Sequence, residues 1–177
     1  MVATCGDDCG LAARQWREVM EAKGMTADAT YSVQMPNTYV IFPGFDVDKS
    51  EVEQRKLSAV PQAADALCQR IEAMEKGDFT HHGSVAWLKS RIIYPWFMRH
   101  VDDTPFATTD ACVGCGRCAA ACPTANITIS SHKPQWHGDC LNCLACYHTC
   151  PHHAVAFGRR TRGKGQYTCP DNKSTSK

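Results

Sequence analysis

The sequence predicts an α+β protein in two parts, an α/β segment followed by a small cysteine-rich domain. Apolar residues up to residue 77 alternate between strand-like and helix-like spacing, and a further helical stripe follows them. Eight of the 12 cysteines lie in two blocks. We therefore predict four regions, an α/β segment, a helical connector, the cysteine domain and a flexible basic tail: residues 1–77, 78–104, 105–158 and 159–177.

Strands and helices are expected to alternate in the segment 1–77. A short strand is predicted near Met1–Thr4, and a helix over residues 10–23. Residues 31–35 alternate as a strand does, and the apolar run 39–42 is expected to continue that strand. A second helix is predicted over residues 48–76, where apolar side chains recur at steps of three and four.

An apolar stripe of Val85, Leu88, Ile92 and Trp96 predicts the helical connector. A basic amphipathic helix of this kind can lie on a membrane surface. Apolar stripes more often pack into cores, so we expect this one to pack against the cysteine domain. No run approaches the roughly 20 apolar residues of a transmembrane helix, so we predict no transmembrane segment.

Both cysteine blocks have the spacing CxxCxxCxxxCP, and each position of the second follows its counterpart by 28 residues. The cysteines of the two blocks are Cys112, Cys115, Cys118 and Cys122, then Cys140, Cys143, Cys146 and Cys150. Four thiolates hold a [4Fe–4S] cluster, and a CxxCxxC loop supplies three of them. The sequence therefore predicts two [4Fe–4S] clusters.

This region resembles bacterial two-cluster ferredoxins over about 50 residues. In that family the cysteine before proline ligates the other cluster, and Pro123 and Pro151 disfavour helical geometry at the cysteines before them. The resemblance implies that cluster I is held by Cys112, Cys115, Cys118 and Cys150. It implies that cluster II is held by Cys140, Cys143, Cys146 and Cys122.

A wider resemblance, to flavodoxin–ferredoxin fusion proteins, rests on residues 112–118, 134–136 and 163–167, and on Thr4–Gly6 after the first strand. It implies that residues 1–77 are an incomplete flavodoxin-like segment, so that the chain starts within such a domain or is a fragment. The phosphate loop of the family has no counterpart in this sequence, so tight FMN binding is not expected. The incomplete sheet is expected to leave an edge that a partner or a second copy covers.

The net charge of +1 does not fit a nucleic-acid-binding protein. The first ten residues lack the basic start and apolar stretch of a signal peptide, so we expect a reducing cytoplasm and metal-bound thiolates. The predicted function is transfer of single electrons between redox partner proteins, by a carrier and not an enzyme. The alternatives are the electron-feeding part of a flavin-linked oxidoreductase, and a module that uses metal, zinc included, only to fold.

Four cysteines have no assigned role: Cys5, Cys9, Cys68 and Cys169. We expect Cys68 to be a buried small side chain on the apolar side of its helix. His148 lies inside the second cysteine block and is expected to make the reduction potential depend on pH. The paired histidines at 81–82 and 152–153 are expected in solvated loops.

Overall fold

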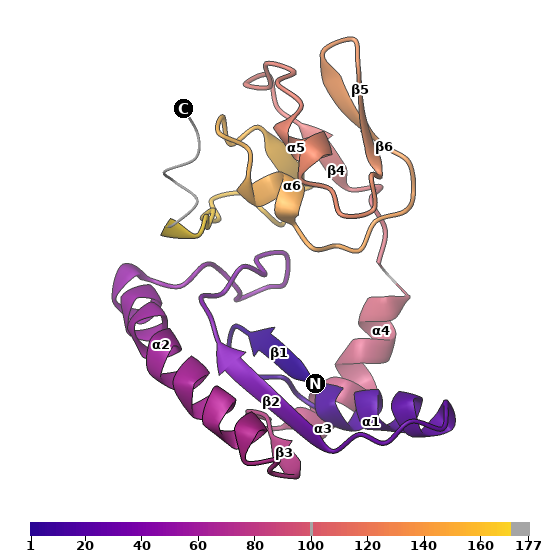
Figure 1. The fold of residues 1–177 in the computed structure, drawn as a ribbon. Coiled ribbons are helices and arrows are strands. Elements are labelled where there is room, and N and C mark those ends of the chain that lie inside the picture. Colours follow the sequence, from indigo (N-terminus) through magenta and orange to yellow (C-terminus); the bar gives the residue numbers. More distant parts are fainter. Residues whose placement is uncertain (100, 171–177) are drawn as a thin grey trace. The chain divides into compact units, whose positions relative to one another are not determined.

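The computed structural model describes residues 1–99 and 101–170, which divide into two compact units (Figure 1). Unit 1 comprises residues 1–37 and 48–99, and unit 2 comprises residues 38–47 and the described residues from 101 onward. Both units contain helices and strands, so the predicted mixed α+β content is confirmed.

A parallel sheet forms the centre of unit 1, in the order β1 (Val2–Cys5), β2 (Ala29–Gln34), β3 (Gly77–Phe79). Two helices, α1 (Ala12–Ala22) and α2 (Ser50–Glu72), connect its strands in turn, because parallel neighbours need a crossover. Among the described residues, β1 and β3 each pair with a strand on one side only.

Both helices and the first two strands of unit 1 lie where the sequence predicts them. The helix α2 continues through Pro61 without a break. The strand β3 was not predicted, since a three-residue strand has no measurable periodicity and depends on its pairing with residues 29–31. The prediction of a strand at residues 39–42 is wrong, because this run forms a loop. Its Val40 and Ile41 side chains are buried in the core of unit 2.

The connector forms a helical succession of α3 (Ala86–Leu88), the π-helical turn η1 (Lys89–Ile93) and α4 (Tyr94–Met98) (Figure 1). Pro95 explains the irregular step, because proline lacks the amide hydrogen that a regular helix would use there. Much of the predicted apolar stripe is exposed, Ile92 for example. Its packing against the cysteine domain therefore stays a prediction.

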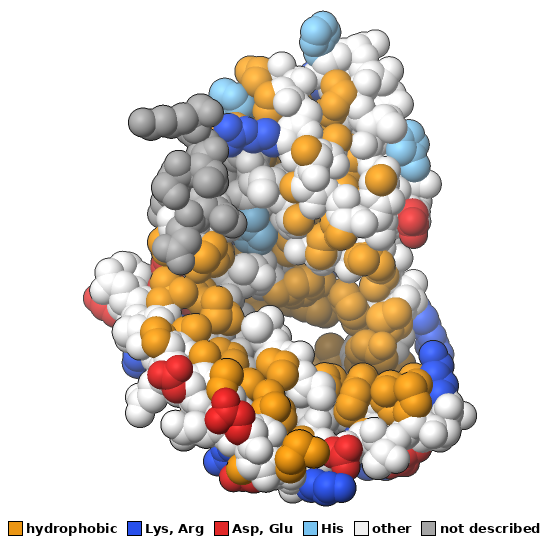
Figure 2. All heavy atoms as spheres, viewed as in Figure 1, with side chains coloured by type: hydrophobic (Ala, Val, Ile, Leu, Met, Phe, Trp, Pro, Cys, Tyr) orange, Lys and Arg blue, Asp and Glu red, His pale blue; other side chains and the backbone are white. Residues whose placement is uncertain are grey.

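Unit 1 presents much apolar surface, and Figure 2 shows hydrophobic side chains gathered over its elements. The helix α2 has no buried residue. Cys68, which was expected to be buried, is exposed on this helix. Apolar spacing shows that side chains share a helix face, but it does not show that anything covers that face. None of the helices in the described ranges has the length and apolar character needed to cross a membrane.

Unit 2 contains two antiparallel strand pairs, β4 (Phe106–Thr108) with β7 (Val155–Phe157) and β5 (Ile127–Ser130) with β6 (Lys133–Trp136). The 28-residue spacing places β4 and β5 in the first half of the cysteine domain and β6 and β7 in the second half. Each pair therefore joins one strand from each half. The two halves are therefore interleaved, and neither half forms a sheet by itself.

The 28-residue repeat of the cysteines extends to the backbone. Helix α5 (Arg117–Ala120) precedes α6 (Ala145–His148) by 28 residues, and β5 precedes β7 by the same interval. Left-handed backbone angles repeat at the same spacing, at Gly114 and Asn142, Gly116 and Leu144, and Ala125 and His153. The two halves thus have the same local fold.

Residues 159–170 of the predicted tail pack within unit 2. Thr161 is buried, and its hydroxyl accepts a hydrogen bond from the Phe157 amide (2.9 Å). The Tyr147 hydroxyl donates to the Lys164 carbonyl (2.9 Å). The remainder of the predicted tail, residues 171–177, lies outside the described residues.

Candidate metal centres

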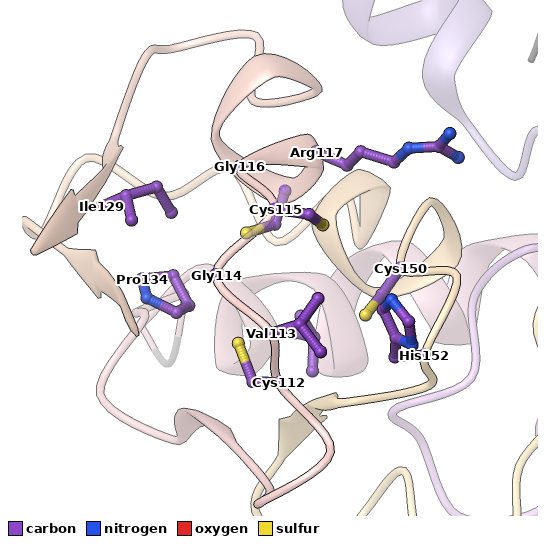
Figure 3. Close-up of a pocket in the computed structure, with 12 residues that line it drawn as sticks. Cys112, Val113, Gly114, Cys115, Gly116, Arg117, Ile129, Pro134, Cys150 and His152 are labelled. Atoms are coloured by element: carbon purple, nitrogen blue, oxygen red, sulfur yellow. The ribbon is translucent and has the colours of Figure 1, made fainter. Parts of the chain in front are cut away.

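The first candidate centre is a pocket lined by all four cysteines that were expected to bind cluster I. Cys112, Cys115 and Cys118 come from the loop that leads into α5, and Cys150 comes from the end of the second block. Figure 3 shows Cys150 across the pocket from the loop that carries Cys112 and Cys115. The structure therefore brings together thiols that are far apart in the sequence.

Glycine shapes the loop of this first centre. Gly114 has a φ of +69°, and a Cβ atom there would lie 2.8 Å from the backbone oxygen of His132. Gly116 also has a left-handed φ, +76°, but a Cβ atom there would meet only the Ile129 side chain, at an ordinary contact distance of 3.9 Å. Gly114 thus lets the cysteine loop approach the turn between β5 and β6, which a larger residue would prevent.

The second candidate centre joins the other four cysteines. Burial raises the pKa of the Cys140 thiol, and the nearby Asp103, Cys143 and Cys122 act in the same direction. Cys146 in turn lies within the electrostatic influence of Cys140 and Cys143. Cys122, from the end of the first block, therefore lies among the thiols of the second block.

Backbone amides point at the cysteine before each proline. The Asn126 amide donates to Cys122 Sγ and the Ala154 amide to Cys150 Sγ, both at 3.3 Å. These two bonds occupy equivalent positions of the repeat. Amide hydrogen bonds of this kind stabilise a thiolate that binds metal and influence the potential of an iron–sulfur cluster.

Burial disfavours the thiolate form of the more enclosed cysteines of both centres. Burial raises the pKa of Cys146 to about 12, and it also raises the pKa of Cys118. Burial acts on Cys122 in the same direction, but hydrogen bonds from Thr124 and from backbone amides outweigh it and lower its pKa. Since only thiolates ligate metal, loading of these centres must release protons.

The donor sets fit an iron–sulfur cluster better than a lone ion. In the part of the chain that the structure describes, no group of three or more His, Cys, Asp or Glu side chains converges closely enough to hold one metal ion. The thiols of the first centre instead surround a pocket, as ligands at separate corners of a cube must. One thiol of each set, Cys115 and Cys143, is exposed.

His148 binds two segments from outside the cysteine blocks, and its expected effect on the reduction potential stays a prediction. Its ring is buried, and burial lowers its pKa. His148 Nε2 donates to the Thr38 carbonyl (2.6 Å), and the Tyr167 amide donates to Nδ1 (3.1 Å). The neutral ring thus joins two distant segments to α6.

Residues 38–47 form a segment that packs against the core of unit 2, with Tyr39 near Cys140. Tyr39 packs against the buried core, and burial, with a smaller influence of Cys140, raises its pKa to about 12. Lys164 Nζ donates to the Phe45 carbonyl (2.6 Å), and the Gly165 amide donates to Asp46 (2.9 Å). The sequence gives no local sign of this arrangement, because the partners are more than 100 residues away.

The next candidate residues belong to unit 1, with one exception in unit 2. Cys5 and Cys9 lie in unit 1, where burial raises the pKa of the Cys5 thiol to about 12 and the neighbouring Cys9 acts in the same direction. His82 Nδ1 lies 2.9 Å from the Gly10 carbonyl oxygen in the same unit. The exception is His152, which lines the pocket of the first centre. His152 is exposed in a turn, as predicted, but its position at the pocket was not predicted.

Comparison with known families identifies the cysteine region. A family model described as a 4Fe-4S dicluster domain matches residues 111–154. No curated protein and no solved structure matches the chain. The chain therefore contains an iron–sulfur, ferredoxin-like region that binds at least one iron–sulfur cluster. The match covers less than half of the chain and does not extend to unit 1.

Proposed function

We propose that this protein carries single electrons on two [4Fe–4S] clusters. Cluster I is held by Cys112, Cys115, Cys118 and Cys150. Cluster II is held by Cys140, Cys143, Cys146 and Cys122. The observation that carries the proposal is the first pocket, because a cysteine of the second block completes the donor set of the first.

A bound [4Fe–4S] cluster supplies reversible one-electron chemistry at each centre. The chain itself provides thiolate ligands, amide hydrogen bonds to their sulfurs, and a buried aromatic core that limits access of water. The exposed Cys115 and Cys143 bring one side of each centre to the surface, where redox partner proteins exchange electrons. Such thiolates require a reducing compartment, so we also propose a cytoplasmic location.

The first experiment measures iron, acid-labile sulfide and flavin in anaerobically purified protein, together with EPR spectra after dithionite reduction. We expect about eight iron and eight sulfide per chain, two clusters of four each, with no flavin. A content of about four iron would contradict the two-cluster proposal. Stoichiometric FMN would instead favour the electron-feeding part of a flavin-linked oxidoreductase, an alternative supported by the parallel strands of unit 1 and the helices that connect them.

Paired cysteine substitutions test which thiols share a cluster. If Cys112 and Cys150 ligate the same cluster, the double variant Cys112→Ala/Cys150→Ala keeps about as much iron as either single variant. The double variant Cys112→Ala/Cys122→Ala should lose nearly all of it, because each substitution empties a different centre. Cys169→Ala is the matched control and should keep the full content. The opposite result for the two double variants would overturn the ligand assignment.

A further inference from the structure

The strand β6 ends in a tryptophan whose polar atom is buried without a partner. The Trp136 ring stacks on Phe106, with centroids 5.5 Å apart and planes 9° apart. Within the described residues, Trp136 Nε1 has no partner that meets full hydrogen-bond geometry, although it is shielded from solvent. A buried N–H group without an acceptor destabilises a protein, so its retention needs an explanation.

The thiol of Cys146 lies beside this indole. Trp136 packs against the buried core that contains Cys146, and its side chain acts to lower the pKa of that thiol against the larger effect of burial. The protonated thiol is a weak acceptor, whereas a ligand thiolate carries negative charge and accepts more strongly. Cluster binding at Cys146 would therefore give the buried indole the acceptor that it lacks.

The 28-residue repeat makes this contact specific to one half. The position equivalent to Trp136 in the first half is Thr108, at the end of β4. The repeat therefore places an indole N–H beside a thiol of the second centre and a threonine at the corresponding place in the first half. The two centres have similar ligands but different surroundings.

We propose that Trp136 is a positioning residue whose indole N–H donates to the Cys146 thiolate and raises the reduction potential of cluster II relative to cluster I. The hydrogen bond stabilises the additional negative charge that one electron brings to the reduced state. The inference rests on the proposed two-cluster function. It predicts that a larger share of the added electrons resides on cluster II in this protein than in a variant that lacks the indole donor.

The test is an EPR-monitored redox titration of the cluster-loaded protein and its Trp136→Phe variant. Phenylalanine keeps an aromatic ring against Phe106 but removes the donor. We expect the potential of cluster II to fall and that of cluster I to stay unchanged. The same titration in a Cys112→Ala background, which lacks cluster I, identifies the signal that moves.

A second substitution separates the hydrogen bond from packing. Benzothienyl-alanine at position 136 has nearly the size of tryptophan but carries sulfur in place of the N–H group, and it should lower the potential as phenylalanine does. An unchanged cluster II potential in this isosteric variant, or equal shifts of both clusters, would overturn the inference. Iron and sulfide analysis of the unaltered protein tests the two-cluster function independently, so the two failures are distinguishable.

Discussion

Substitution of His148 should release two segments from the second centre at once. The side chain is buried on α6, and it is the shared partner of the Thr38 carbonyl and the Tyr167 amide. Because Nδ1 accepts one hydrogen bond, Nε2 must carry the proton that is donated in the other. Replacement by leucine removes both bonds while keeping an apolar side chain of moderate size.

The expected loss follows from these two bonds. Each typical hydrogen bond contributes about 1 kcal/mol net, and a buried group left without a partner costs about 1–3 kcal/mol. His148→Leu should therefore lower the free energy of unfolding by about 2–4 kcal/mol. His148→Gln can keep a donor near the Nε2 position and His148→Asn an acceptor near Nδ1, so each should lose about half as much.

Urea denaturation of the loaded protein under anaerobic conditions measures this loss, with iron content checked first in each variant. His153→Asn is the matched control, because His153 lies in an exposed left-handed turn that asparagine tolerates. Since Tyr39 lies near Cys140, His148→Leu should also accelerate the bleaching in air of the proposed cluster II and increase proteolysis within residues 38–47. Unchanged stability and unchanged bleaching would refute the anchoring role.

Two further substitutions probe the backbone of the first centre and the sheet of unit 1. Gly114→Ala should lower the iron content and the melting temperature more than Gly116→Ala. Both substitutions incur about 1–2 kcal/mol of left-handed strain. Only the Cβ atom added at position 114 would lie 2.8 Å from the His132 backbone oxygen. Equal losses would contradict this account. Asp78→Asn should weaken the hydrogen bond to the buried Thr30 hydroxyl (2.8 Å) and destabilise the protein at pH 7. Burial opposes ionisation of Asp78, but its hydrogen bonds outweigh burial and hold its pKa below 3.8. The stabilisation is therefore fully present above pH 3.8 and lost as the pH falls through the lowered pKa, so urea denaturation should show a difference between the two proteins that shrinks in acid.

An iron–sulfur region could be predicted from the cysteines, because cluster binding demands a fixed local spacing between them. Three of the four proposed ligands of each cluster lie on one short loop, so their spacing can be recognised directly in the sequence. The helices α1 and α2 could be predicted from apolar periodicity for a similar reason. The exposure of Cys68 could not be predicted in this way. Apolar spacing shows which face of the helix Cys68 occupies, but not whether another element packs against that face.

The strand prediction for residues 39–42 was wrong for a different physical reason. The apolar side chains of this run do fit a strand, but Val40 and Ile41 are buried in the core of unit 2, which consists mostly of residues after 100. Contacts at such separation leave no mark on local periodicity. The short strand β3 shares this limit, since only its pairing with β2 defines it.

The repeat itself contains a signal for these distant contacts. Tyr147 and His148 occupy the positions of Ala119 and Ala120 in the first half, and both large side chains bind segments from outside the cysteine loops. Trp136 likewise stands where the first half has Thr108. Under the proposed two-cluster function, the two halves need the same residues only for binding the same kind of cluster. Positions where one half departs to a large or polar side chain therefore indicate where the rest of the chain attaches or where one centre is adjusted, and comparison of the two halves would have selected Trp136, Tyr147 and His148 from the sequence.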